Sequence, residues 1–346
     1  MNRQPFRLGI THDFLKPDGT LGFGDIGLDL LEQNARIERT YMPDHGAEVP
    51  AAVANQFDAL LVLAPRVTAA TLDGGTRLAL VARFGVGYDN VDVPACTRNN
   101  VLLTITPAAV RRPVATSALA LLLALSHRLL IKDRLTRAGR WADRLDHMGV
   151  GLTGRTLGLV GLGNIGQEIA RLVAPFQMRL AAFDPYVSPQ TARASGVELL
   201  ELDALLSQAD FVCVCCALTP QTHHLLDARR LARMKATAFL INVARGPIVD
   251  QTALTTLLQE KRIAGAALDV FEKEPIDADD PLLTLGNVIV SPHAICWTDE
   301  LFRNNGVAAC QSILDVAAGR EPMDVVNRDV LAQPLMRQKL SRFARS

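Results

Sequence analysis

Three ionisable side chains each follow an apolar stretch in the second half of the chain. Arg245 comes directly after the run FLINVA, Glu274 lies just beyond ALDV, and His293 follows NVIVSP. A charged group so close to a hydrophobic core must be paired or serve a ligand, because an isolated buried charge is costly. Ligands bind outside the carboxyl ends of the strands in an open parallel sheet, so the three side chains are predicted to face one cleft.

These residue types suggest hydride transfer to or from a carbonyl group. The planar fork of Arg245 is suited to holding a carboxylate and polarising the neighbouring C=O. His293 would donate a proton to the carbonyl oxygen, and Glu274 would orient the imidazole and favour its charged form. A single strand-end histidine is more often structural, and a single glutamate before a proline is usually a solvated loop residue. The three together in consecutive strand ends favour the catalytic interpretation.

A glycine pattern earlier in the chain predicts a nucleotide site. The stretch TLGLVGLGNIGQEIARL places Gly161, Gly163 and Gly166 in a G-x-G-x-x-G motif between an apolar strand and a helical pattern. Gly161 permits a tight turn, Gly163 lets a pyrophosphate approach the backbone, and Gly166 allows close packing of helix on strand. The helix start near Asn164 and Ile165 would offer its free amides to the phosphates.

Asp184 ends the second strand of this series, at the offset expected for the acid that binds the adenine ribose. A carboxylate there would repel a 2′-phosphate, and no Arg or Lys follows in DPYVS, so NAD is predicted rather than NADP. The alternative is a glycine-rich turn that binds nothing.

Short β-like runs alternate with helical stretches, which predicts an α/β fold with parallel sheets. In the first series, the expected strands are Arg7–Ile10, Ile37–Tyr41, Ala59–Leu63, Leu80–Arg83 and Val101–Ile105. In the second, they are TLGLVG, RLAAFD, VELL, FVCVCCA, AFLINVA, AALDV and NVIVS. One long helix is expected between the series, starting after Pro113. A helix over 299–318 would cross back, so the predicted domains are 1–107 with 295–346, and 108–294.

Composition excludes several functional classes. Lys+Arg and Asp+Glu both number 36, so no net charge favours nucleic acid. The start lacks the apolar region of a signal peptide, and the longest apolar run, Ala118–Leu125, is shorter than the roughly 20 residues of a membrane span. A soluble, cytoplasmic protein is expected. Cys213, Cys215 and Cys216 are interpreted as small buried side chains in a strand, and no metal site is predicted.

Five ordered motifs resemble one known family. GLVGLGNIGQEIA, INVARGPIVD, ALDVFEKEP and SPHAI follow in order, and ARFGVGYDNVDVPA lies upstream. Together they are similar to the NAD-dependent D-2-hydroxyacid dehydrogenases, which include phosphoglycerate and D-lactate dehydrogenases and hydroxypyruvate reductases. The resemblance covers roughly residues 50–325. It implies a discontinuous, flavodoxin-like substrate domain with an inserted NAD-binding Rossmann domain.

The resemblance also implies roles for individual residues. Arg245 would bind the substrate carboxylate and carbonyl, with His293 as acid/base and Glu274 as its partner. Asp269 would contact the nicotinamide carboxamide. Backbone amides around Val86 and Gly87 would hold the substrate carboxylate. Further cofactor contacts are implied for Cys216, Thr222 and Val243. The stretch RAGRWADRLDHMGVGLTGR is similar to the arm through which family members form homodimers.

Several positions depart from the family pattern. Thr116 stands where a glutamate is common, and Cys216–Thr219 reads CALT instead of CPLT. Trp297, one helical turn past His293, is interpreted either as a wall of the substrate pocket or as a core or interface residue. The pair Arg111 and Arg112 would meet a substrate phosphate or, as the favoured interpretation, lie solvated at an interdomain hinge.

Two other functions remain open from the sequence. The same fold serves NAD(H)-sensing corepressors that dock partner proteins, although this chain shows no long disordered tail. Formate or phosphite dehydrogenases use a related Arg/His pair. The favoured prediction is a dehydrogenase acting on a small D-2-hydroxy acid.

Overall fold

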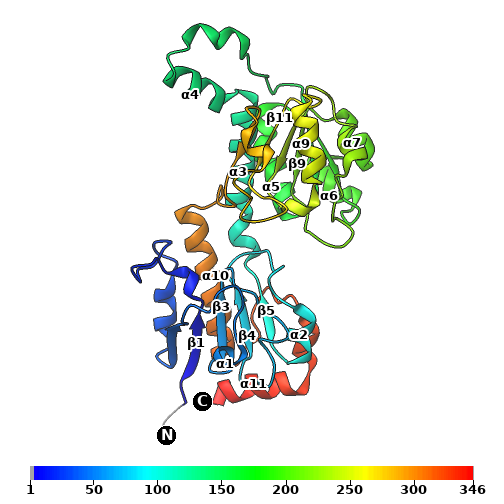
Figure 1. The fold of residues 1–346 in the computed structure, drawn as a ribbon. Helices are drawn as coiled ribbons and strands as arrows, with labels where there is room; N and C mark the ends of the chain where they lie inside the picture. Colours follow the sequence, from blue (N-terminus) through cyan, green and yellow to red (C-terminus); the bar gives the residue numbers. More distant parts are fainter. Residues whose placement is uncertain (1–3, 346) are drawn as a thin grey trace. The chain divides into compact units, whose positions relative to one another are not determined.

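The computed structural model describes residues 4–345, which form two compact units that are taken one at a time below (Figure 1). The first unit comprises Met1–Val110 and Trp297–Ser346, and the second is the segment Arg111–Cys296. The chain therefore leaves the first unit, builds the second, and returns to complete the first.

The first unit contains a five-stranded parallel sheet. Its strands are β1 (Phe6–Ile10), β2 (Ile37–Tyr41), β3 (Ala59–Val62), β4 (Leu80–Arg83) and β5 (Leu102–Thr104). They lie in the order β2-β1-β3-β4-β5, which is the flavodoxin-like arrangement. The predicted strands and the flavodoxin-like class are confirmed.

Helices cover both faces of this sheet. They are α1 (Ala51–Ala54), α2 (Val93–Arg98), α10 (Asp299–Ala317) and α11 (Pro334–Arg345), with short 3₁₀ helices η1 (His12–Phe14), η2 (Leu28–Gln33) and η7 (Arg328–Ala332). Strand β3 is buried on both sides, as its unbroken apolar sequence requires. Leu61 joins a core with Ile313 of α10, whereas Leu60 joins a core with Ala95 of α2.

The second unit contains a seven-stranded parallel sheet. Its strands are β6 (Thr156–Val160), β7 (Arg179–Phe183), β8 (Glu198–Leu199), β9 (Phe211–Val214), β10 (Phe239–Asn242), β11 (Gly265–Leu268) and β12 (Val288–Val290). The order β8-β7-β6-β9-β10-β11-β12 is the 3-2-1-4-5-6 order of a dinucleotide-binding fold with one strand added. The predicted Rossmann class is confirmed.

The connections of the second unit are mostly helical. They are α3 (Pro107–Ser126), α4 (Leu129–Arg137), η3 (Trp141–Asp146), α5 (Asn164–Val173), η4 (Ala174–Phe176), α6 (Pro189–Ala194), α7 (Leu202–Gln208), α8 (Ala228–Leu231), η5 (Gly246–Ile248), α9 (Gln251–Gln259) and η6 (Pro281–Thr284). Segments α4 and η3 extend from the unit as an arm (Figure 1).

The prediction that the long helix starts after Pro113 is wrong. Helix α3 begins at Pro107, where a missing N–H costs no hydrogen bond, and Pro113 lies inside it. The fixed φ of proline fits a helix, and packing of Ala115 and Ala118 in the core offsets the one lost bond. The helix also ends early, because Arg128 adopts a left-handed φ of 51° and separates α3 from α4.

By length and composition alone, α3 is apolar enough to cross a membrane, and half of its apolar stretch is buried in the protein. The sequence prediction was based on the uninterrupted apolar run Ala118–Leu125, which is shorter than the apolar stretch of the whole helix. Its buried side chains Leu121, Leu122 and Leu125 belong to a core of the second unit.

An ion-pair network joins α3 to α5. Arg112 donates to Glu168 Oε1 at 2.9 Å and Arg171 donates to the same oxygen at 2.7 Å, while Glu168 is only 8% exposed. The hydrogen bonds from Arg171 and Arg112 hold the pKa of Glu168 at about 2. Arg112 is therefore an ion-pair partner of the buried Glu168, a contact that the sequence did not predict.

Replacing Glu168 by glutamine should destabilise the protein by about 1–2 kcal/mol at neutral pH, since charged hydrogen bonds are lost. The folded pKa lies below the ordinary value of 4.5, so the wild-type contribution is complete above about pH 4.5 and disappears as the pH falls towards about 2. Urea unfolding midpoints of wild type and variant should converge over that range. The exposed Glu198→Gln is the control, and a pH-independent gap would contradict the prediction.

Candidate active site

The glycine loop after β6 has the geometry of a ligand cradle. Gly161 has a left-handed φ of 104°, and a Cβ there would lie 2.8 Å from the amide nitrogen of Cys216. A Cβ on Gly166 would lie 2.4 Å from the carbonyl oxygen of Gly161. A Cβ on Gly163, in contrast, would meet no heavy atom within 4 Å. Packing therefore requires Gly161 and Gly166, whereas Gly163 leaves room for a ligand.

Helix α5 starts directly at this open position. Gly163 is its N-cap, so the amides of Asn164 and Ile165 lie in the first turn, where no intrahelical acceptor exists. Such amides and the positive helix end suit a pyrophosphate. The described residues therefore fit a dinucleotide.

Asp184 lies at the end of β7 and stabilises the same loop. Its Oδ2 accepts a hydrogen bond from the Leu162 amide at 2.8 Å, and its Oδ1 accepts from the amides of Tyr186 and Val187 at 2.9 and 3.2 Å. The carboxylate is thus fixed beside the glycine loop by three backbone donors. The sequence predicted its position but not these bonds.

The cysteine-rich strand ends sooner than predicted. Strand β9 stops at Val214, so only Cys213 lies inside it and is buried, while Cys215 and Cys216 are half-buried beyond it. The prediction that all three are buried strand residues is wrong for the last two. Cys215 Sγ lies 3.1 Å from the Gly161 carbonyl oxygen, so these residues support the glycine loop.

His293 and Glu274 form a direct pair. His293 Nδ1 lies 2.7 Å from Glu274 Oε2, and Glu274 Oε1 also accepts from the Phe271 amide at 3.0 Å. Burial raises the pKa of Glu274, but the bonds from His293 and Phe271, with the charges of His293 and Arg245, lower it below its usual value. The carboxylate therefore stays ionised and can hold a protonated imidazole.

A glycine beside Arg245 brings its segment close to that of Glu274. Arg245 lies between β10 and η5 as the N-cap of η5, and its Nη1 donates to the Ala244 carbonyl at 2.7 Å. A Cβ on the next residue, Gly246, would lie 1.9 Å from the carbonyl carbon of Phe271. Only glycine lets these two backbones meet, which brings the segment of Arg245 against the segment of Glu274.

Asp269 is buried behind His293, with 3% of its surface exposed. Its Oδ1 accepts from the amides of Ala294 and Ile295, both at 3.0 Å, and its carbonyl oxygen accepts from the His293 amide at 2.8 Å. Burial raises the pKa of Asp269 above its usual value, although these hydrogen bonds act to lower it. Asp269 thus holds the segment on which His293 lies, a contribution that the sequence did not indicate.

The remaining implied cofactor contacts also lie at strand ends of this unit. Thr222 donates through Oγ1 to the Ala217 carbonyl at 2.8 Å, which closes the turn after β9. Val243 directly follows β10, and its amide donates to the Val214 carbonyl at 3.4 Å. The loops after β6, β7, β9, β10 and β11 therefore carry the predicted cofactor residues on one edge of the sheet.

Known proteins share this sequence and fold. Residues 119–294 match the family model described as D-isomer specific 2-hydroxyacid dehydrogenase, NAD binding domain. Glyoxylate reductase from Korarchaeum cryptofilum is 39% identical, covering 79% of this chain and 84% of that protein. The chain belongs to the D-isomer specific 2-hydroxyacid dehydrogenase family.

Two further relatives agree with this assignment. D-3-phosphoglycerate dehydrogenase from Synechocystis is 36% identical to this chain. The matched region covers 90% of this chain and 56% of that longer protein. The crystal structure of the TT0316 protein from Thermus thermophilus has a TM-score of 0.80 at 31% identity, covering 93% of this chain and all of that one. The protein is thus an NAD-dependent oxidoreductase that interconverts D-2-hydroxy acids and 2-oxo acids with a nicotinamide cofactor.

The first unit of the dehydrogenase carries the other residues implied to bind substrate. Val86 and Gly87 follow β4 in a loop where Gly85 has a φ of 134°, a conformation that L side chains rarely adopt. The Thr106 amide donates to the Gly85 carbonyl at 3.0 Å. Trp297 is 51% exposed and precedes α10 in a non-helical segment, so it does not lie one helical turn past His293.

A second His–Glu pair in the dehydrogenase was not predicted. His224 Nε2 lies 2.7 Å from Glu272 Oε1, which also accepts from the Gln251 amide at 3.1 Å. The fold brings the turn after β9 beside the segment after β11, so no short stretch of the sequence could have predicted this pair.

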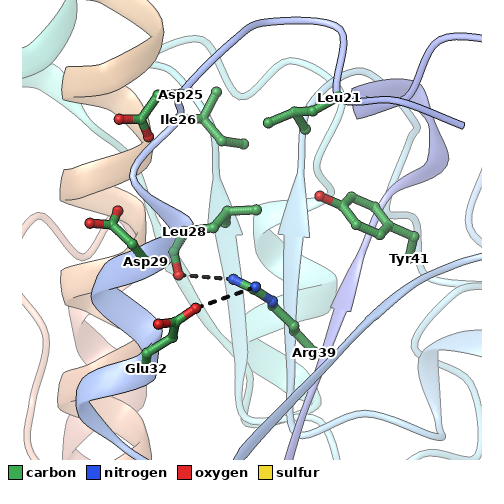
Figure 2. A pocket seen from close by; sticks show the side chains of 8 residues that line it. All are labelled: Leu21, Asp25, Ile26, Leu28, Asp29, Glu32, Arg39 and Tyr41. Atoms are coloured by element: carbon green, nitrogen blue, oxygen red, sulfur yellow. Dashed lines mark hydrogen bonds and ion pairs between the residues drawn. The ribbon is translucent and has the colours of Figure 1, made fainter.

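A pocket of about 330 Å³ in the first unit has a different character (Figure 2). It is lined by Leu21, Asp25, Ile26, Leu28, Asp29, Glu32, Arg39 and Tyr41. Its carboxylates are all paired, since Glu32 lies 3.7 Å from Arg39, while Asp25 and Asp29 both pair with Arg303. None of the predicted site residues lines it, and no ligand is assigned to it.

Proposed function

We propose that this dehydrogenase converts a small 2-oxo acid to its D-2-hydroxy acid with NADH, and back, using Arg245, Glu274 and His293. The observation that supports this most directly is the 2.7 Å pair of His293 and Glu274, with the charge of Arg245 acting on the same carboxylate. The nicotinamide supplies the hydride.

The protein groups divide the remaining work. The guanidinium of Arg245 holds the substrate carboxylate and polarises the carbonyl. His293 gives its proton to the carbonyl oxygen as the alkoxide forms, and takes it back in the reverse direction. Glu274 is a positioning residue that keeps the imidazole oriented and charged.

We propose NAD rather than NADP as the cofactor, because Asp184 is fixed by three backbone bonds next to the glycine loop. A carboxylate there accepts bonds from ribose hydroxyls and repels a 2′-phosphate.

Replacing Asp184 by serine should lower the preference for NADH over NADPH by about 10- to 100-fold, as expected for loss of one or two charged hydrogen bonds. The measurement is kcat/KM for each cofactor at saturating substrate. Asp184→Asn, which removes the charge but keeps a side-chain oxygen, is the matched control. An unchanged cofactor ratio in both variants would remove Asp184 from cofactor selection.

We further propose a cytoplasmic homodimer formed through the arm. The arm exposes Leu129, Leu130, Trp141, Leu145 and Met148, the last two at 80% each. Such a set of exposed apolar side chains indicates a protein interface.

The six cysteines are all free, as is usual for a protein in a reducing compartment such as the cytoplasm. Light scattering should give twice the monomer mass, and a monomer at micromolar concentration would contradict the dimer.

The activity is tested by following NADH and NADPH oxidation with a panel of 2-oxo acids that includes glyoxylate, hydroxypyruvate and 3-phosphohydroxypyruvate. Turnover of at least one acid with NADH is expected. Tight NADH binding without turnover of any acid, formate or phosphite would contradict the proposal and favour a cofactor-sensing role.

A further inference from the structure

Glu274 lies in a stretch of chain that packing holds only loosely. Residues 269–280 join β11 to η6 without helix or strand. From residue 272 to residue 280, every residue is exposed except the half-buried Ile276 and Asp280. A side chain that orients His293 needs a position fixed to within about 0.5 Å. Hydrogen bonds must therefore supply what packing does not.

Residues 272–280, here called the acidic loop, also repel one another. The acidic loop carries one ammonium, Lys273, against the carboxylates of Glu272, Glu274, Asp277, Asp279 and Asp280. Lys273 is paired with Asp277, so no cation within the loop remains for the other carboxylates. Excess charge of one sign disfavours a compact conformation. The acidic loop therefore depends on neighbouring elements to keep one conformation.

Gln251, the first residue of α9, binds both ends of the acidic loop. Its Oε1 accepts from the Glu272 amide at 3.1 Å, and its Nε2 donates to Asp280 Oδ2 at 2.9 Å. The Gln251 amide also donates to Glu272 Oε1 at 3.1 Å. Glu274 lies between the two bound residues, so one side chain fixes the span that carries it.

The two partners of the Gln251 side chain require opposite atoms. The Glu272 N–H needs an acceptor, whereas the Asp280 carboxylate needs a donor, and a side-chain amide supplies both. A flipped amide would lose both bonds, and a carboxylate at position 251 would repel Asp280. Asp280 is held from its other side as well, since its Oδ1 accepts from the Leu282 amide at 2.9 Å and caps η6.

His224 also meets the acidic loop, but in a different way. Its contact ends at the carboxylate of Glu272. The bonds of Gln251 instead reach the main chain of Glu272 and the residue that caps η6. Gln251, and not His224, therefore restrains the path of the chain on either side of Glu274.

We propose that Gln251 is a positioning residue for the reaction, which holds the acidic loop so that Glu274 stays 2.7 Å from His293. This inference rests on the proposed function, because it assumes that the pair of Glu274 and His293 serves proton transfer. Gln251 acts only through Glu274.

The first test exchanges donor and acceptor. Gln251→Glu and Asp280→Asn should each lower kcat by about 5- to 50-fold, because a displacement of about 1 Å can cost about 10²-fold. The double variant can form both bonds again, with the carboxylate at position 251 accepting from the amide at position 280. Its kcat should return to within about threefold of wild type. Gln259→Glu, at the exposed end of α9, and Asp279→Asn, exposed in the acidic loop, are the charge controls.

A second test shows whether Gln251 acts through Glu274. In a Glu274→Gln background, Gln251→Glu should lower kcat by less than about twofold further, because both residues belong to one interaction. The affinity for NADH should not change in these variants, since the glycine loop follows a different strand, β6.

Three results would overturn the inference. The first is a wild-type kcat in both single variants, and the second is a double variant as slow as the single ones. The third is a full additional loss in the Glu274→Gln background, which would assign Gln251 a general structural role.

Hydrogen exchange separates this inference from the proposed function, because it needs no turnover. Both single variants should speed amide exchange in the acidic loop by about 3- to 10-fold, the contribution of one hydrogen bond, and the double variant should restore it. If no 2-oxo acid is turned over but exchange follows this pattern, the proposed function fails and Gln251 still holds the loop. If turnover occurs and exchange is the same in all variants, the inference fails alone.

Discussion

Replacing His293 by asparagine is expected to lower kcat by about 10²- to 10⁴-fold, the usual contribution of a general acid/base. Asparagine keeps a polar side chain of similar length but cannot deliver a proton at neutral pH. Because the glycine loop and Asp184 lie on other strand ends, the affinity for NADH should not change. Steady-state turnover of the best 2-oxo acid and a direct NADH titration measure the two effects.

The chain provides a matched control for this substitution. His224 pairs with Glu272 at the same 2.7 Å that separates His293 from Glu274, and both pairs lie in the second unit. His224→Asn should therefore remove a comparable His–Glu contact while leaving kcat near the wild-type value. If the two variants lose activity equally, His293 has no special role in proton transfer.

Replacing Arg245 by lysine should lower kcat/KM by about 10²- to 10³-fold, comparable with the loss of one donor to a developing oxyanion. Lysine keeps the positive charge but lacks the planar fork that contacts a carboxylate with two parallel bonds. Most of the loss should appear for the 2-oxo acid, with little change in NADH affinity.

Arg229→Lys is the control for Arg245. Arg229 bonds to Asp203 at 2.9 Å on the surface of the same unit, and its replacement should not alter turnover. A kcat/KM for Arg245→Lys within a few-fold of wild type would show that charge alone suffices and that the fork is not needed.

Much of the fold follows from local sequence. Apolar runs predicted most strands of both sheets, since a strand buried on both faces needs an unbroken apolar sequence. The exceptions are β2, with the sequence IERTY, and the two-residue β8, which lack such a run. The prediction of where α3 begins was wrong because Pro107 and Pro113 look alike in the sequence. Only burial of Ala115 and Ala118 decides that the helix passes through the second proline.

The glycine loop and the three ionisable strand-end residues could be identified from residue types and spacing. Backbone sterics are local, so Gly161 and its left-handed φ follow from the motif and its flanking strand and helix.

The tertiary structure alone decided how distant segments meet. It pairs Glu274 with His293, packs Gly246 against Phe271, and places Phe23 beside Trp297. These contacts depend on strand order and packing of whole elements, and no short window of the sequence encodes them. The chemistry is therefore predictable from residue types, whereas the geometry that makes it a site is a property of the fold.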